Sequence, residues 1–267
     1  MKVIGLLSDF GLQDSYVAEM KAVILSACPE ARLLDISHEI RKFDVRMGAF
    51  VLASAARSFP EGSIYLAVVD PGVGSKRRPL IAQSNRSLYV GPDNGLLMLS
   101  AVREGLRSVY CIKDQEYLRD AASATFHGRD VFARVVGDLA NEVPPLEIGF
   151  EVENYVKPEF SRPIVNENSI GCEVLHVDDF GNIVTNVDVF SIKKSNLIPK
   201  RTMVLTQGRK RLRLGFVRTY NEIPEGALGC LVGSHGFLEI AMRMRDASKA
   251  ARVKPGSKLK IVVSNPV

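Results

Sequence analysis

The stretch KVIGLLSDFGLQDSYVAEMKAVILSACPEARLLDIS, residues 2–37, decides the fold of the first half of the chain. Its two ends, KVIGLLS and ARLLDIS, are short apolar runs that predict β-strands, and apolar residues at helical spacing predict an amphipathic helix over 14–27. Asp14 stands where it would cap the start of that helix. A strand, a helix and a second strand in this order predict a βαβ unit with parallel strands.

The same alternation continues to about residue 142. Further strands are expected over 63–70, within 88–95 and over 109–112, and further helices over 44–59, 96–105 and 129–142. We therefore expect an α/β domain with a mostly parallel sheet over residues 1–157.

The second half of the chain has a different pattern. Residues 143–165 carry four prolines and no helical period, and we place a linker at residues 158–169. Beyond it, short alternating runs predict seven strands, over 171–177, 182–187, 201–206, 210–216, 228–234, 236–242 and 258–263. These strands suit a smaller all-β domain, barrel-like or a sandwich, over residues 170–267.

The composition is that of a soluble globular protein, with 46% apolar and 24% charged residues among 267. Ser8 and Asp9 interrupt the first apolar run before it could serve as a signal peptide, and no apolar stretch approaches the roughly 20 residues of a membrane helix. We expect a cytoplasmic protein without a membrane partner. The four cysteines stand singly, so neither a disulfide framework nor a zinc site is indicated.

The net charge of +5 raises the question of an acidic partner such as RNA. Cations concentrate in RKRLRL (209–214) and in residues 243–260, but Arg211 and Arg213 alternate with leucines as in a half-buried strand. The chain has no tryptophan, and the aromatic interleaving of a base-stacking surface is absent. A solvated basic face is the favoured interpretation, and nucleic-acid binding the minor one.

Two motifs follow predicted strands directly, where ligand sites of α/β domains gather. In SDFG (8–11), Asp9 could satisfy backbone donors of a turn, or its two oxygens could accept both hydroxyls of a ribose. In DPGVGSKR (70–77), two glycines permit a tight turn that brings Arg77 back to Asp70. The alternatives there are an exposed ion pair of little energetic value and a site where both side chains face one small molecule.

Two further motifs contain candidate site residues. His127 in TFHGRD (125–130) stands at a predicted helix start, which should lower its pKa and keep it neutral, although a packed structural histidine is a fair alternative. HVDDFGNIVTN (176–186) has the residues of a hairpin turn, and its two carboxylates could also clasp a cationic amino acid. GSHGF (233–237) lacks the GxSxG spacing of serine hydrolases, and the HExxH motif of zinc hydrolases does not occur. The sequence therefore disfavours both of these enzyme classes.

Six motifs in this order, SDFG, DPGVGSKR, VGPDNG (90–95), FHGRD, DDFGNIVTN and GSHGFLEIA, resemble the S-adenosyl-L-methionine hydrolase family. The family is also called S-adenosyl-methionine hydroxide adenosyltransferase, and it is related to fluorinase and chlorinase. The resemblance covers essentially the whole chain. It implies cleavage of S-adenosyl-methionine by water into adenosine and methionine, without a cofactor or metal. It also implies a homotrimer whose sites lie between one subunit's N-terminal domain and its neighbour's C-terminal domain.

The resemblance also implies roles for individual residues. Asp70, Arg77 and His127 match the family's water-activating triad, and Asp9 matches its ribose-binding aspartate. The remaining matches are to residues that line the pocket or contact methionine, adenine or ribose: Phe126, Asp178, Phe180, Asn182, Tyr220, Ser234 and Met242. Water needs activation because its pKa lies far above neutral pH, which makes it a poor nucleophile. Whether Asp70 or His127 accepts the proton is left open by the sequence.

Two alternatives remain beside the hydrolase. Halogenating relatives have an uncharged residue at the position of Asp70, because a carboxylate would repel a halide, and fluorinases have an inserted loop where this chain has only QSNRS (83–87). Both features favour the hydrolase over a halide-dependent halogenase. The other alternative is a protein that binds adenosine or S-adenosyl-methionine without turnover. His235 stands where the family usually has a small residue.

Overall fold

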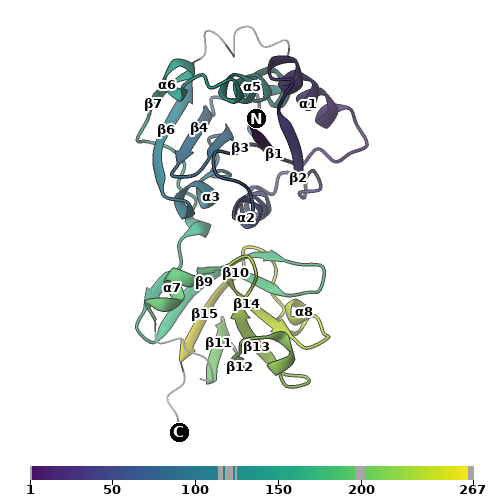
Figure 1. Cartoon of the computed structure of the whole chain (residues 1–267). Helices are drawn as coiled ribbons and strands as arrows, with labels where there is room; N and C mark the ends of the chain where they lie inside the picture. Colours follow the sequence, from purple (N-terminus) through teal and green to yellow (C-terminus); the bar gives the residue numbers. More distant parts are fainter. Residues whose placement is uncertain (1, 114–116, 118–122, 124, 196–201, 264–267) are drawn as a thin grey trace. The chain divides into compact units, whose positions relative to one another are not determined.

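The computed structural model of this chain describes residues 2–113, 117, 123, 125–195 and 202–263 (Figure 1). The chain divides into two compact units, Met1–Pro158 and Glu159–Val267. Each unit has its own sheet and its own buried apolar core. No helix among the described residues is both long and apolar enough to cross a bilayer.

The first unit contains a seven-stranded sheet in the order β2-β1-β3-β5-β4-β6-β7. The strands are β1 Val3–Ser8, β2 Arg32–Ser37, β3 Ile64–Val68, β4 Pro79–Ser84, β5 Leu88–Pro92, β6 Leu106–Ile112 and β7 Gly149–Glu151. The pairs β1–β2, β1–β3 and β3–β5 are parallel, which confirms the βαβ unit. The pairs β4–β5, β4–β6 and β6–β7 are antiparallel, so the sheet is mixed, and the expectation of a mostly parallel sheet is wrong.

The antiparallel half of this sheet arises from β4, which the sequence pattern did not reveal. The connection from Ser84 to Leu88 is too short for a crossover helix, so β5 must run back beside β4. Ser84 closes the turn, because its backbone N–H donates to the carbonyl of Ser87 and its hydroxyl accepts from the N–H of Ser87. A short connection therefore sets the direction of half of the sheet.

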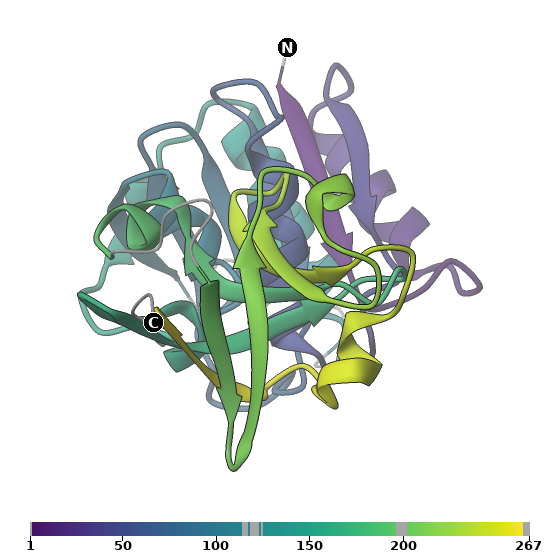
Figure 2. The same ribbon diagram turned by 90° about the horizontal axis from the view of Figure 1, so that it is seen from below.

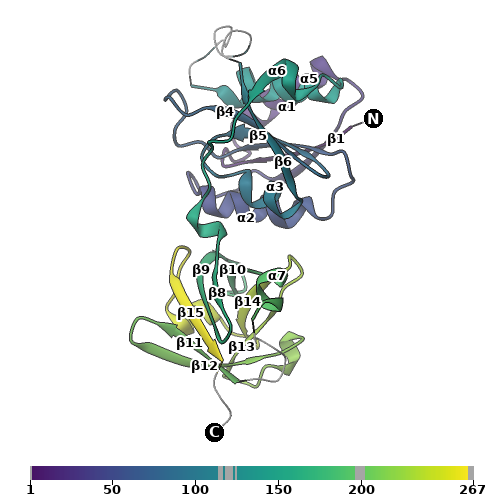
Figure 3. The ribbon, with the colours of Figure 1, turned by 90° about the vertical axis from the view of Figure 1, so that its left-hand side faces the viewer.

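Helices cover both faces of the sheet (Figure 3). One face carries α1 Tyr16–Ala27, α5 Arg134–Ala140 and α6 Pro145–Ile148, and the other carries α2 Val45–Ala56 and α3 Met98–Arg103.

The N-terminal caps of two helices differ. Helix α1 begins with Ser15 at its N-cap, so the prediction that Asp14 caps this helix is wrong. Asp44 caps α2, because its side chain accepts from the N–H of Met47.

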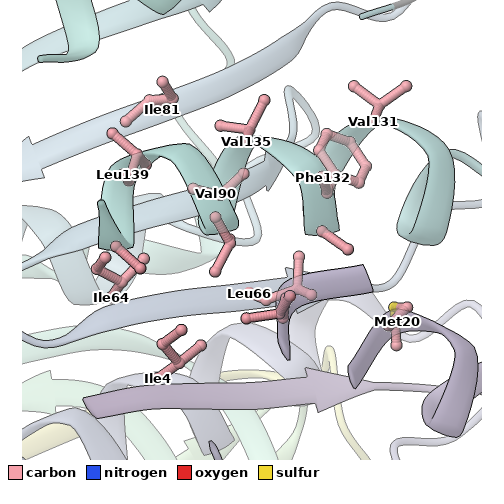
Figure 4. Close-up of a cluster of buried hydrophobic side chains, with 14 of the residues drawn as sticks. Ile4, Met20, Ile64, Leu66, Ile81, Val90, Val131, Phe132, Val135 and Leu139 are labelled. Carbon is pink, nitrogen blue, oxygen red and sulfur yellow. The ribbon is translucent and has the colours of Figure 1, made fainter. Parts of the chain in front are cut away.

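Residues 129–142, expected as one helix, instead start in a wider π-helical segment, Gly128–Ala133, that runs into α5. This segment and α5 pack on the sheet, and their side chains, among them Val131, Phe132 and Leu139, belong to the core of the first unit. Figure 4 shows sheet side chains facing helix side chains, among them Ile4, Leu66, Val90, Phe132, Val135 and Leu139. A fully buried side chain of this size contributes about 1.5–3 kcal/mol to folding.

The second unit is a closed barrel, seen from below in Figure 2, where the hairpin of β11 and β12 is green. Its strands are β8 Ile164–Asn166, β9 Ser169–Val177, β10 Ile183–Asp188, β11 Thr202–Gln207, β12 Lys210–Phe216, β13 Leu228–Val232, β14 Phe237–Met242 and β15 Lys258–Val263. The ring runs β10-β14-β13-β12-β11-β15-β9 and closes by pairing of β9 with β10. All seven strands expected for this half are confirmed.

Some regular structure lies where none was expected. Strand β8 pairs antiparallel with β9 and belongs to the barrel unit, although it falls within the expected linker at residues 158–169. Helix α6 and strand β7 lie in the proline-containing stretch before it. Two short helices, α7 Val189–Lys193 and α8 Ala247–Ala251, follow barrel strands, and a 3₁₀ turn spans Tyr220–Glu222.

Candidate active site

The turn after β3 brings Asp70 and Arg77 together. Arg77 Nε donates to both carboxylate oxygens of Asp70, at 3.1 and 2.9 Å, and Arg77 Nη2 donates to Asp70 Oδ2 at 2.5 Å. The side chains of Asp70 and Arg77 are 5% and 9% exposed, so this is not the exposed ion pair considered above. Gly72 makes room for it, because a Cβ there would lie 3.3 Å from Arg77 Cγ.

His127 joins this pair through Arg77. Arg77 Nη2 lies 2.8 Å from His127 Nδ1, and because arginine stays protonated, Arg77 is the donor and Nδ1 the acceptor. The neutral imidazole therefore carries its proton on Nε2. Burial and then the charge of Arg77 lower the pKa of His127, against the opposing effect of Asp70 and Asp130. The expected direction is confirmed, but the causes are burial and Arg77 rather than a helix terminus.

One nitrogen of the Arg77 guanidinium, Nη1, differs from the other two in its hydrogen bonding. Nη1 is buried and has no hydrogen-bond partner among the described residues. The Phe132 ring lies against the guanidinium, with its centroid 5.2 Å from Cζ. Buried donors in folded proteins are normally paired, so this unpaired cationic N–H is a candidate donor to a small acceptor such as water or hydroxide.

Two members of the triad, Asp70 and His127, line a cavity of about 250 Å³. Its walls are mostly apolar, and they include Phe10, Tyr16, Val68, Asp70, Val73, Thr125, Phe126, His127 and Gly128. The rings of Phe10, Tyr16 and Phe126 contact one another, with centroid distances of 5.1–5.8 Å. Phe126 thus lies on the wall of this cavity, and its contact with substrate stays a prediction. Phe10 and Tyr16 were not predicted, although Phe10 belongs to the SDFG motif.

Asp9 lies at the end of β1 but does not line this cavity. Its side chain is buried, and Oδ2 accepts from the backbone N–H of Phe43 at 2.8 Å. Lys42 Nζ donates to the Asp9 carbonyl at 2.5 Å, and the hydroxyl of Ser8 accepts from the N–H of Phe10. The turn function of this motif is therefore present, and ribose binding by Asp9 stays a prediction.

The barrel unit has a larger pocket, of about 700 Å³. Five predicted residues line it: Asp178, Phe180, Asn182, Tyr220 and Met242. Phe180 is 82% exposed, so most of its ring remains uncovered within this unit. Ser234 is not brought to this pocket; it is exposed in the turn between β13 and β14.

The turn at Asp178 is built by that carboxylate itself. Oδ1 accepts from the backbone N–H groups of Phe180 and Asn182, and Oδ2 accepts from the side-chain amide of Asn182. Gly181 adopts φ +83°, and a Cβ there would collide with Asp246. The hairpin expected between β9 and β10 is therefore confirmed, and the clasp for a cationic amino acid stays a prediction.

Three residues of this pocket were missed: Met244, Arg245 and Asp246. Met244 has φ +51° and is 96% exposed. Asp246 caps α8, and hydrogen bonds from Ser248 and from the backbone N–H of Lys249 lower its pKa to about 2. The sequence RMRD (243–246) has no periodicity that could place these side chains on a pocket wall.

The residues that the structure describes contain no group of three or more His, Cys, Asp or Glu side chains arranged to hold a metal ion.

Comparison with known proteins covers nearly the entire chain. Residues 4–149 match the family model of the SAM hydroxide adenosyltransferase N-terminal domain, and residues 172–260 match that of its C-terminal domain. The chain is 37% identical to the (R)-S-adenosyl-L-methionine hydrolase of Thermus thermophilus, over 98% of this chain and 100% of that protein. It is 24% identical to the fluorinase of Nocardia brasiliensis, over 98% of this chain and 97% of that one.

Among solved structures, an uncharacterized conserved protein from Thermotoga maritima matches with a TM-score of 0.86 and 34% identity, over 97% of this chain and 99% of that one. The two family-model matches fall one in each of the two units of the fold. The chain therefore belongs to the SAM hydroxide adenosyltransferase family.

Proposed function

We propose that this protein hydrolyses S-adenosyl-L-methionine to adenosine and L-methionine by attack of water or hydroxide on C5′. The observation that carries the proposal is the buried Asp70–Arg77–His127 cluster at an apolar cavity. The proposal is supported by the family to which the chain belongs and by its similarity to an (R)-S-adenosyl-L-methionine hydrolase. The (R)-epimer at sulfur is accordingly the proposed substrate of this chain.

The reaction asks little of the protein. The sulfonium leaves C5′ as a neutral thioether, so the leaving group needs no acid, and the site must supply an oriented nucleophile. In the proposed mechanism the attacking oxygen occupies the acceptor position beside Arg77 Nη1, where the buried positive charge stabilises hydroxide character. This requires no metal or cofactor.

Asp70 is the proposed proton acceptor. The Nδ1 lone pair of His127 already accepts from Arg77, and the other ring nitrogen carries the proton. Asp70 has about four lone-pair positions on its two oxygens, and Arg77 makes three contacts to them. One position therefore remains to accept a proton. His127 then serves to orient Arg77, and Asp70 takes the proton as the C5′–O bond forms.

The other matched residues receive substrate-binding roles. Phe126 would line the sulfonium region together with Phe10 and Tyr16, since aromatic ring faces attract cations. Asp9 would accept the ribose hydroxyls. The contacts to methionine, adenine or ribose fall to Asp178, Phe180, Asn182, Tyr220, Ser234 and Met242.

The test of the reaction is product analysis with separated (R)- and (S)-epimers of S-adenosyl-methionine. Equimolar adenosine and methionine, formed from the (R)-epimer at a rate independent of added chloride or fluoride, support the proposal. A rate that rises with halide, with a 5′-halo nucleoside as product, would instead assign the chain to the halogenases. Bound but unchanged substrate would assign it to the non-catalytic binding proteins.

The pKa shift of His127 predicts the pH dependence. As pH falls through the lowered pKa, His127 gains a proton on Nδ1, stops accepting from Arg77 and becomes a second cation beside it. We expect kcat to fall only below pH 6.5, the ordinary value for histidine. Steady-state rates across the acid range measure this. In His127→Asn, the amide oxygen can still accept from Arg77, and the fall of kcat at acid pH should shift to a different pH. If this fall stays at the same pH, His127 is not the group that causes it.

We also propose a homotrimer in which each site combines one subunit's N-terminal domain with its neighbour's C-terminal domain. Mixing Asp70→Ala subunits with Asp178→Ala subunits, followed by dissociation and reassembly, is expected to restore activity to about one quarter of the sites under random assembly. Each variant reassembled alone is the control. Light scattering gives the mass of the assembly. If the mixed and reassembled subunits regain no activity, each site is built within one subunit.

A further inference from the structure

Strand β14 carries a buried carboxylate, Glu239, that lines neither cavity. Its side chain is 3% exposed. Oε1 accepts from the hydroxyl of Tyr220 at 2.6 Å, and Oε2 lies 3.1 Å from His235 Nε2. Glu239 therefore joins a residue of the barrel pocket wall to the turn between β13 and β14 that carries Ser234.

The direction of the His235 contact follows from its other ring nitrogen. The backbone N–H of Phe237 donates to His235 Nδ1 at 3.3 Å, so Nδ1 is an acceptor and the proton of the neutral ring is on Nε2. His235 Nε2 therefore donates to Glu239, which accepts on both oxygens. Gly233 is needed for this approach, because a Cβ there would lie 2.6 Å from both Glu239 Oε2 and His235 Cε1.

The Tyr220 hydroxyl is held in its donor form. Burial first, and then its hydrogen bond to Glu239, raise the pKa of Tyr220 above the usual value, so the phenol keeps its proton near neutral pH. A short hydrogen bond to a carboxylate is about twice as strong as one between neutral groups. The ring of Tyr220 is half exposed on the pocket wall. Its hydrogen bond to the buried Glu239 therefore fixes the orientation of the ring.

We propose that Glu239 is a positioning residue for substrate binding: it fixes the ring of Tyr220 against the nucleoside and, through His235, the backbone turn at Ser234. This rests on the proposed function, which makes Tyr220 and Ser234 substrate contacts. His235, where the family usually has a small residue, then serves to secure Glu239 rather than to contact methionine. Glu239 touches no reacting atom, so its effect falls on binding and not on the chemical step.

The test compares Tyr220→Phe, Glu239→Gln and the double variant with Glu225→Gln, an exposed glutamate of the same unit, as matched control. In each single variant we expect KM for S-adenosyl-methionine to rise about tenfold, the loss of one charge-assisted hydrogen bond, with kcat little changed. The double variant should be no worse than Glu239→Gln, because the one contact that Tyr220→Phe removes is already altered in Glu239→Gln. Calorimetry with adenosine gives a second readout that does not depend on turnover.

Three outcomes separate the two proposals. Wild-type protein that neither binds adenosine nor turns over substrate overturns the proposed function and this inference together. Wild-type turnover with unchanged KM and adenosine affinity in Glu239→Gln and Tyr220→Phe overturns the inference alone, as does a fall in kcat at constant KM. If thermal melting shows that Glu239→Gln is unfolded, Tyr220→Phe still decides the matter, since it removes only the hydroxyl that contacts Glu239.

Discussion

Replacement of Asp70 by asparagine is expected to lower kcat for S-adenosyl-methionine hydrolysis by about 10²–10⁴-fold, the usual contribution of a general base. Asparagine has the size of aspartate, and its amide oxygen still accepts from Arg77, but it cannot take the proton of the attacking water. KM should change little, because the carboxylate acts on the nucleophile. Adenosine formed per unit time, measured by liquid chromatography, gives both constants.

The matched control for this variant lies in the same unit. Asp93, whose side chain is as buried as that of Asp70, forms an ion pair with the more exposed Arg78 at 2.6 Å and also accepts from the backbone N–H of Val156. Asp93→Asn should reduce stability but leave kcat close to the wild-type value. Near wild-type turnover in Asp70→Asn, or an equal loss of turnover in Asp93→Asn, would show that the carboxylate of Asp70 is structural.

Replacement of Arg77 by lysine is expected to lower kcat by about 10²–10³-fold, the usual effect of removing one donor that stabilises developing oxygen charge. The charge is kept, but an ammonium is a point charge without the planar fork that contacts Asp70 and His127 at once and leaves Nη1 for the nucleophile. Pre-steady-state rates separate the chemical step from product release.

The control for Arg77→Lys is Arg78→Lys, the neighbouring arginine, which pairs with Asp93 and contacts the carbonyl of Asn154. Its loss should affect folding more than turnover. If Arg77→Lys retains most of the activity, the positive charge alone is sufficient, and the role given to the Nη1 position is wrong.

The barrel could be predicted from its sequence almost strand by strand, because its strands are short apolar runs bounded by turn residues, and in some of them, such as β12, buried and exposed positions alternate. KRLRLGF is the clearest case: Leu214 and Phe216 are buried, whereas Arg211 and Arg213 are exposed. In the α/β unit, PLIAQS was missed because it follows a cationic turn and begins with proline. Without β4, the antiparallel half of the sheet could not be inferred.

The candidate site was predictable as a set of residues but not as a geometry. A strand end, two glycines and an arginine indicated that Asp70 and Arg77 could meet, and the structure places both side chains in contact. The contact of Arg77 with His127 joins positions 50 residues apart, and nothing in local spacing reveals which ring nitrogen it engages. Glu239 was missed for a related reason: an alternating pattern would place this carboxylate on the solvated face, whereas β14 is buried at five consecutive positions.

Direct attack of water on C5′ is tested most directly by single-turnover hydrolysis of (R)-S-adenosyl-methionine in ¹⁸O-labelled water, with mass spectrometry of both products. The mechanism predicts one labelled oxygen in the 5′-hydroxyl of adenosine and none in methionine. Unlabelled adenosine, or release of adenine in place of adenosine, would contradict it.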